Sequence, residues 1–90
     1  MTIALHQRPT FKRVYKKLHV NQRDVVHNAM RKLIDNPMLG EEKKGDLTGV
    51  WVYKFDCIDR QYLLAYSWDA TTRTWLAVGP HENFYRDLKR

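Results

Sequence analysis

The chain has 90 residues, of which 43% are hydrophobic and 12% aromatic, enough for one domain with one modest core. No apolar run of about 18 residues is present, so no transmembrane helix is expected, and the N-terminus lacks the apolar segment of a secretory signal. The single cysteine, Cys57, excludes an internal disulfide and indicates a reducing, cytoplasmic setting, in which a lone thiol is by default a small buried hydrophobe.

The charge is basic and unevenly distributed. Sixteen lysine and arginine residues against ten acidic residues give a formal net charge of +6. Residues 1–45 hold ten basic and four acidic side chains, whereas residues 46–90 hold six of each. A basic half on so small a domain favours a polyanionic partner, nucleic acid first and an acidic protein second. The alternative is a solvated, lysine-rich helix surface that only keeps the protein soluble.

A basic amphipathic helix is predicted near the N-terminus, after a weakly indicated strand over residues 2–6. Pro9 stands where a helix can begin, because the first turn tolerates its missing N–H. Apolar residues then recur at helical spacing, at Phe11, Val14, Tyr15 and Leu18. Lysine and arginine occupy the other side, and the helix is expected to end near His19.

A second helix is predicted to run back antiparallel to the first. Asn21 is its expected N-cap, with Asp24 in the first turn. Apolar pairs recur every four residues, at Val25, Val26, Ala29, Met30, Leu33 and Ile34. The helix is expected to stop at Asn36, because the residue before Pro37 avoids the helical conformation.

The hydrophobic period changes after a polar connection over residues 37–49. Three β-branched and aromatic strands are predicted, over residues 50–55, 62–68 and 74–78. Short turns at residues 56–60 and 69–73 make them an antiparallel meander. Gly79 and Pro80 are expected to break the third strand, before a short basic C-terminal helix over residues 81–90.

The predicted fold is therefore α+β, as a single domain over residues 1–90. An N-terminal helical hairpin packs on a twisted antiparallel sheet, which is a meander of three strands to which an N-terminal strand adds a fourth. The helices cover one face of the sheet. The other face is left to aromatic and charged side chains, and a binding or catalytic surface is expected there.

Known nucleotide, zinc and serine-hydrolase motifs are all missing, so no metal ion and no cofactor is expected. The histidines His6, His19 and His27 are scattered and suggest no ligand set. His81 differs from them because it follows the end of a strand, where the sheet would hold it open to solvent. Imidazole titrates near neutral pH and is therefore suited to proton transfer.

Further residues that suit RNA chemistry accompany His81. Tyr85, one helical turn on, offers a stacking ring and a hydroxyl group. Cations that could neutralise a phosphate are Lys43, Lys44, Lys54, Arg60, Arg73 and Arg86. Together these residue types fit metal-free RNA cleavage, in which a base takes the 2′-hydroxyl proton, an acid protonates the leaving 5′-oxygen and cations stabilise the charge on phosphorus. The alternative is a His-Glu pair that only decorates the surface.

The chain resembles the RelE/ParE superfamily of toxins from bacterial type II toxin–antitoxin systems over nearly its whole length. The order and spacing of several segments carry the resemblance: the helical hairpin ending in Leu33-Ile34-Asp35-Asn36-Pro37, the connection from Gly40 to Val50, the strand over residues 60–66, and the closing Val78-Gly79-Pro80-His81-Glu82-Asn83-Phe84-Tyr85. The resemblance implies two helices packed against a twisted antiparallel sheet.

Two activities occur in this superfamily. RelE-like members bind the ribosomal A site and cut mRNA there, whereas ParE-like members poison DNA gyrase. The ending Gly79-x-His81-x-x-Phe84-Tyr85 is similar to that of YafQ-like ribonucleases, whose histidine is catalytic, and its tyrosine with nearby basic residues is similar to RelE. The resemblance thus implies that His81 is the acid–base residue, Tyr85 a stacking or relay residue, and Arg60 and Lys54 phosphate clamps.

The chain also departs from these patterns. The additional histidines and the aspartate of the YafQ pattern have no clear counterpart beyond Asp56 or Asp59. Pro80-His81 stands where RelE has a basic residue at the end of its final strand. The branch of the superfamily, and with it the full catalytic set, is therefore left open by the sequence.

The favoured interpretation is a ribosome-dependent mRNA endonuclease that blocks translation. The alternatives are a ParE-like inhibitor of DNA gyrase without catalysis, and a non-catalytic module that binds an antitoxin. The expected partners are a cognate antitoxin, the ribosome and mRNA, with operator DNA contacted only through the antitoxin complex and no membrane contact. An acidic, partly disordered antitoxin segment is expected to dock on a basic sheet face with exposed Trp and Tyr.

Overall fold

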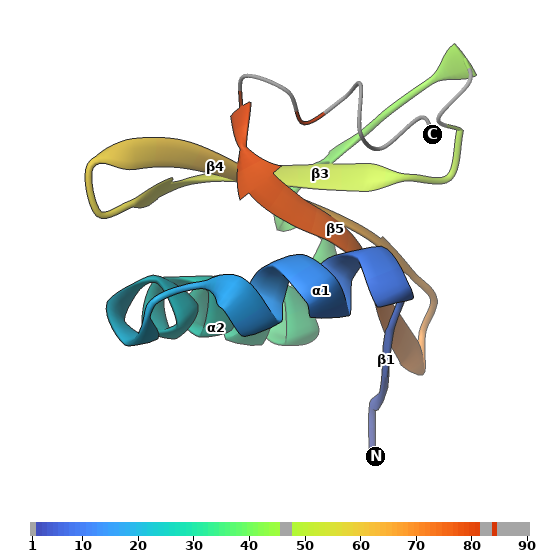
Figure 1. The fold of residues 1–90 in the computed structure, drawn as a ribbon. Coiled ribbons are helices and arrows are strands. Elements are labelled where there is room, and N and C mark those ends of the chain that lie inside the picture. The colour runs from blue at the N-terminus through green and yellow to red at the C-terminus, as the bar shows by residue number, and fades with distance from the viewer. Residues whose placement is uncertain (1, 46–47, 82–83, 85–90) are drawn as a thin grey trace.

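The computed structural model describes residues 2–45, 48–81 and 84. Two helices lie on one side of a five-stranded sheet (Figure 1). The helical elements are α1 (Pro9–Lys17), α2 (Val20–Asp35) and the 3-10 helix η1 (Pro37–Leu39). The strands are β1 (Ala4–Gln7), β2 (Glu41–Glu42), β3 (Trp51–Cys57), β4 (Arg60–Trp68) and β5 (Thr72–Pro80). The α+β class predicted from the sequence is confirmed.

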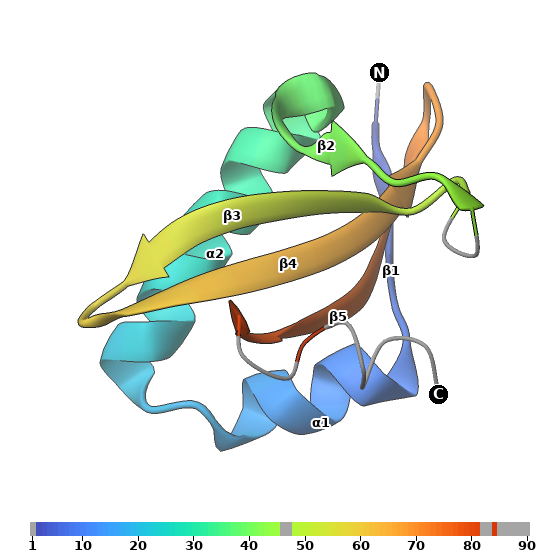
Figure 2. The ribbon, with the colours of Figure 1, turned by 90° about the horizontal axis from the view of Figure 1, so that it is seen from above.

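The sheet has the strand order β1-β5-β4-β3-β2 (Figure 2). The predicted meander of β3, β4 and β5 is antiparallel, but β1 pairs with β5 in parallel, from Ala4 opposite Thr72 to Gln7 opposite Trp75. The sheet is therefore mixed, and the prediction of a purely antiparallel sheet is wrong. β1 leads directly into α1, which packs over β5. At this junction the N–H of Arg8 still bonds to the carbonyl of Trp75 at 3.0 Å, so the chain stays beside β5 until α1 begins. This course gives β1 its parallel direction.

Several element boundaries also differ from the prediction. Gly79 and Pro80 continue β5, where they lie opposite Leu63 and Tyr62, instead of breaking it. A proline is tolerated at this point because it is the last residue of the strand and need not donate to the ladder. The two-residue strand β2, which pairs with the start of β3, was not predicted.

The N-terminus of α2 is capped by His19 and not by Asn21. The backbone N–H of His19 donates to Oε1 of Gln22 at 3.0 Å, which makes one half of a capping box. Asn36 ends the helix as predicted, and its side-chain oxygen accepts from the N–H of Met38 at the start of η1. The two helices are not a tight antiparallel pair, because α2 runs back at an incline to α1 (Figure 2).

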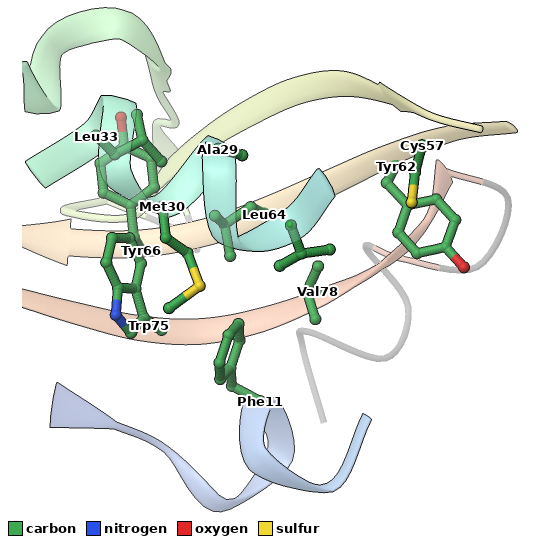
Figure 3. Packing of buried hydrophobic residues seen from close by; sticks show 11 residues of the cluster. Phe11, Ala29, Met30, Leu33, Cys57, Tyr62, Leu64, Tyr66, Trp75 and Val78 are labelled. Atoms are coloured by element: carbon green, nitrogen blue, oxygen red, sulfur yellow. The ribbon is translucent and has the colours of Figure 1, made fainter. Parts of the chain in front are cut away.

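The main core lies between the helices and the sheet (Figure 3). Phe11 is its contribution from α1, which confirms the apolar side predicted for that helix. The strands contribute large residues, of which Tyr66 and Trp75 are fully buried. From α2 come Val26, Ala29, Met30 and Leu33. No helix in the described part of the chain is long and apolar enough to cross a membrane.

Arg73 is a buried cation, with 5% of its surface exposed. Its Nε donates to the carbonyl of Leu33 at 3.1 Å, and Nη2 to that of Ile34 at 3.0 Å. Its Nη1 donates to the carbonyls of Asp69 and Thr72. A positive charge at the last turn of a helix satisfies carbonyls that have no partner within the helix. The sequence-based interpretation of Arg73 as a phosphate ligand is therefore corrected: its donors are occupied inside the fold.

Tyr66 makes a second connection to the segment that follows α2. Its hydroxyl donates to the carbonyl of Pro37 at 2.6 Å and accepts from the N–H of Gly40 at 3.0 Å. Burial raises the pKa of the Tyr66 phenol, against the opposing effects of the Gly40 hydrogen bond and the Arg73 charge. The phenol is thus held in its neutral, hydrogen-bonding form.

We expect Arg73→Met to lower the free energy of unfolding by at least about 2 kcal/mol, because four carbonyls lose a charged donor inside the protein. Urea unfolding followed by tryptophan fluorescence measures this change. Arg31→Met is the matched control, since Arg31 is exposed on α2 and its loss should change stability by no more than about 0.5 kcal/mol. Equal stability of the two variants would contradict the structural role of Arg73.

We expect Tyr66→Phe to destabilise the protein by about 1–3 kcal/mol at pH 7, because the Pro37 carbonyl and the Gly40 N–H lose their partner. The variant should also flatten the alkaline pH dependence. As pH rises above the unfolded tyrosine pKa of about 10, the unfolded chain loses a proton that the folded chain keeps, so stability falls. Urea unfolding between pH 8 and pH 11 would contradict this account if both proteins lost stability with the same slope.

Candidate functional site

The two faces of the sheet carry different side chains. Aromatic residues of β3 and β4 pack on the helix side, where Trp51, Tyr53, Phe55 and Trp68 are half-buried around the main core. The prediction that exposed Trp and Tyr would line the opposite, basic face is therefore wrong. Alternation along a strand explains the outcome, because the residues between these aromatics must point the other way.

The face turned away from the helices, here called the far face, has an apolar centre and a polar end. The apolar residues Val52, Leu63, Ala65 and Ala77 form a second cluster there, and Phe84 packs on them with 4% of its surface exposed. Strand alternation also places exposed Lys54, Asp56 and Gln61 on the far face. Phe84 thus covers the apolar part, and the exposed polar side chains lie beyond it.

The antiparallel register brings three of the predicted site residues to one end of the sheet. Arg60 begins β4 opposite Cys57, the last residue of β3, and Pro80 ends β5 opposite Tyr62. His81 follows Pro80 directly, so Arg60 and His81 lie at the same end of the sheet, which we call the hairpin end, although strand alternation turns Arg60 to the helix side with Cys57 and Tyr62 and leaves Lys54 on the far face. Lys54 lies three residues before the end of β3, and all three side chains are exposed.

Gly79 leaves space within this arrangement. Lys54 is opposite Leu63, and Leu63 is opposite Gly79, so the three positions form a row across the far face. A Cβ atom added at Gly79 would meet no atom within 4 Å. Gly79 is itself buried, however, so its backbone is not open to solvent. The sequence predicts that Gly79 breaks the strand, whereas the pairing register places it within β5.

The cationic side chains at the hairpin end have no acidic partner among the described residues. The one ion pair between described residues joins Nζ of Lys43 to Oε1 of Glu41, at 3.3 Å, and lies elsewhere. Lys54 and Arg60 can thus offer their charge to an anion. Burial raises the pKa of the Tyr62 phenol. The charges of Cys57 and Asp59 raise it further, whereas the charge of Arg60, two residues earlier in β4, lowers it.

Cys57 is not a nucleophile of this site. It is buried in the main core, with 1% of its surface exposed, as expected for a lone thiol. Burial raises the pKa of the thiol and the Asp59 carboxylate raises it further, so the thiolate is disfavoured. In residues 2–45, 48–81 and 84, no three His, Cys, Asp or Glu side chains are grouped so that they could hold a metal ion.

The remaining predicted phosphate ligands lie elsewhere or outside the described residues. Lys43 and Lys44 follow β2, which pairs with the beginning of β3, so they lie at the opposite end of the sheet from His81. Tyr85, Arg86 and most of the predicted C-terminal helix lie outside the described residues. The structure therefore places Lys54, Arg60 and His81 at one end of the sheet, with Lys54 and Arg60 on opposite faces, and separates them from Lys43, Lys44 and Arg73.

Residues 5–89 match the family model described as ParE-like toxin of type II bacterial toxin–antitoxin system. The chain belongs to this family, and it is the toxin component of such a system. The match covers both helices, the sheet and the hairpin end. The resemblance to the RelE/ParE superfamily is thereby confirmed.

Among the solved structures similar to this chain are toxin RelE and RelBE toxin–antitoxin complexes. A doubly substituted variant of E. coli toxin RelE in the free state has a TM-score of 0.73 at 16% identity, over 98% of this chain and 90% of that chain. The toxin–antitoxin complex RelBE2 from Mycobacterium tuberculosis matches with 0.73 at 24% identity, over 90% and 100%. The intact E. coli RelBE complex matches with 0.72 at 16% identity, over 90% and 99%. At these identities the similarity establishes the shared fold. A comparison with curated protein sequences gives no significant match.

We expect Gly79→Ala to change the free energy of unfolding by no more than about 0.5 kcal/mol, because the added Cβ contacts nothing. Gly79→Leu places a larger side chain at this buried position, opposite Leu63 and two residues before His81, and thermal unfolding checks that the variant is folded. Binding of a short single-stranded RNA, measured by fluorescence anisotropy, should therefore be weakened by Gly79→Leu and retained by Gly79→Ala. Equal RNA binding by both folded variants would exclude this part of the far face as a ligand surface.

Proposed function

We propose that this toxin is a ribosome-dependent mRNA endonuclease and that the hairpin end of the sheet is its active site. The observation that carries the proposal is the position of His81. It is an exposed imidazole held directly after a sheet strand, at the edge that also carries Arg60, with Lys54 nearby on the far face. An imidazole at the same end of the sheet as cations that have no acidic partner among the described residues is suited to a phosphodiester.

The proposed reaction is an in-line transfer within the RNA itself. The 2′-oxygen loses its proton and bonds to phosphorus, the bond from phosphorus to the 5′-oxygen breaks, and the 5′-oxygen gains a proton. The products are a 2′,3′-cyclic phosphate and a free 5′-hydroxyl, so atoms and charge balance without a co-reactant. We assign proton transfer to His81 and stabilisation of the phosphorane charge to Arg60 and Lys54. The sequence adds Tyr85 as the stacking or relay residue.

Ribosome dependence follows from how little of the substrate this site can hold. Among the described residues, Phe84 packs on the apolar cluster of the far face, and the exposed side chains of that face lie towards the hairpin end. A site of two cations and one imidazole cannot by itself fix three consecutive nucleotides in the in-line geometry that the reaction needs. An mRNA already extended on the ribosome supplies that geometry.

A cognate antitoxin is the second proposed partner. Its acidic segment would neutralise Lys54 and Arg60 and thereby exclude RNA phosphates from the hairpin end. Contacts of operator DNA would then be made through the antitoxin. If saturating antitoxin left RNA binding by the toxin unchanged, this mode of inhibition would be ruled out.

We expect His81→Gln to lower the rate of mRNA cleavage by at least about 100-fold, because the amide keeps hydrogen bonds but cannot transfer a proton at neutral pH. Stability and antitoxin affinity should be nearly unchanged, since His81 is exposed. Primer extension on ribosome-bound reporter mRNA measures the rate. His27→Gln is the matched control, since His27 is exposed on α2 away from the site. Tyr85→Ala should lose more activity than Tyr85→Phe, which keeps the stacking ring.

Two results would overturn the proposal. A folded His81→Gln protein that cuts mRNA near the wild-type rate would remove His81 from the chemistry and leave it to the cations and Tyr85. Intact mRNA together with stalled replication and a DNA-damage response would instead identify DNA gyrase as the target.

A further inference from the structure

Helix α1 presents an unusually dense row of positive charge. Arg8 directly precedes the helix, and the four cations within the helix are all exposed: Lys12, Arg13, Lys16 and Lys17. Residues four apart lie one above the other on a helix, with a rise of about 5.4 Å per turn. The cations therefore form two adjacent rows along one side of α1, Arg8-Lys12-Lys16 and Arg13-Lys17.

Nothing within the described part of the chain neutralises these rows. None of the five cations forms an ion pair with a described residue, and α1 contains no acidic residue. Like charges four apart on a helix repel and destabilise it. This arrangement therefore lowers the stability of α1 in the isolated protein, and a bound polyanion would remove the repulsion.

The chemistry of the exposed side favours a nucleic-acid backbone over a protein partner. The large apolar residues of α1 turn towards the sheet, where Phe11 is fully buried and Val14 and Tyr15 are half-buried. The exposed side thus has no apolar anchor. Protein interfaces depend on such anchors and are depleted in lysine, whereas phosphate backbones are bound mainly by rows of lysine and arginine.

The position of α1 relates this charged side to the proposed active site. α1 lies along β5 on the helix side of the sheet, and Lys16 and Lys17 stand at the end of α1 that lies on the same side of the molecule as the end of β5 (Figures 1 and 2). His81 follows β5 directly. An RNA bound along α1 would therefore lie close to the hairpin end without occupying the far face.

We propose that the exposed side of α1 is a docking surface for the phosphate backbone of folded, double-stranded RNA, separate from the surface that takes the single strand to be cut. Its role in orienting the toxin on the ribosome rests on the proposed function. The binding of double-stranded RNA by α1 does not, because it follows from the charge and exposure of α1 alone.

The test uses the full-length protein with His81→Gln, so that no cleavage interferes, and a 20-base-pair RNA duplex of mixed sequence. Binding is measured by fluorescence anisotropy at several salt concentrations. Adding Lys12→Gln and Lys16→Gln should weaken binding and reduce the slope of log affinity against log salt by roughly two, since each lost phosphate contact removes about 0.9. The matched control adds Arg31→Gln and Lys32→Gln, which remove two exposed cations from α2, and it should keep the wild-type slope.

Equal losses in the two double variants would show that only net charge matters and would overturn the proposal. Unchanged duplex binding by the α1 variant, with loss of antitoxin binding instead, would assign α1 to an acidic protein. Thermal unfolding checks that the α1 variant is folded, and it should be at least as stable as its parent because like-charge repulsion is removed. Failure of the wild-type protein to cut mRNA would count against the proposed function and would leave the duplex-binding result standing.

Discussion

A buried guanidinium group fixes how the second helix meets the sheet. Arg73 binds two carbonyls at the end of α2 and two in the segment that leads into β5, and its cationic carbon lies 5.8 Å from the centre of the Trp68 ring. A cation without these four acceptors would be too costly to bury at this depth. The end of α2, the β4–β5 turn and the start of β5 must therefore keep one relative position.

This constraint acts on the proposed active site through the pairing register. With the start of β5 fixed by Arg73, its pairing with β4 determines that β5 ends opposite Tyr62 and that His81 follows at the edge where β4 begins. A slip of one residue would turn the imidazole to the other face of the sheet. The position of His81, which follows the end of β5, is thus set by the contacts of Arg73 near the start of that strand. The core therefore positions an exposed histidine that is not itself part of the core.

The cation that stabilises the fold is distinct from the cations that are available to bind a ligand. The arginine at the core is bonded to carbonyls, whereas Lys54, Arg60 and the cations of α1 have no acidic partner among the described residues. Unpaired surface cations contribute little to folding. In this small domain they are available for phosphates, on α1 and at the hairpin end of the sheet. A bound polyanion at either place would therefore strengthen the fold by mass action.

Much of the fold follows from the sequence because local patterns determine it. Local patterns correctly predict the apolar side of α1, the end of α2 before Pro37, and the two aromatic strands β3 and β4. What the sequence could not supply depends on contacts between distant segments. The parallel direction of β1 is set by its entry into α1, and Trp75 and Tyr66 are buried because of the face that α2 covers.

The predictions for the candidate site show the same difference between local patterns and contacts of distant segments. His81, Lys54 and Arg60 were selected by residue type and resemblance, and the strand register brings them to one end of the sheet. Arg73 was predicted to bind phosphate from its residue type alone, yet its contact with the end of α2 is a tertiary property that charge does not reveal.

The central claim is that the hairpin end catalyses attack by a 2′-hydroxyl on the neighbouring phosphate of ribosome-bound mRNA. The most direct measurement supplies ribosomes with an mRNA that carries a 2′-O-methyl group at the nucleotide before the cut, and compares it with the unmodified mRNA. The account predicts that the unmodified mRNA yields fragments ending in a 2′,3′-cyclic phosphate and that the methylated mRNA stays intact. Cleavage of both mRNAs at similar rates, or of neither, would contradict it.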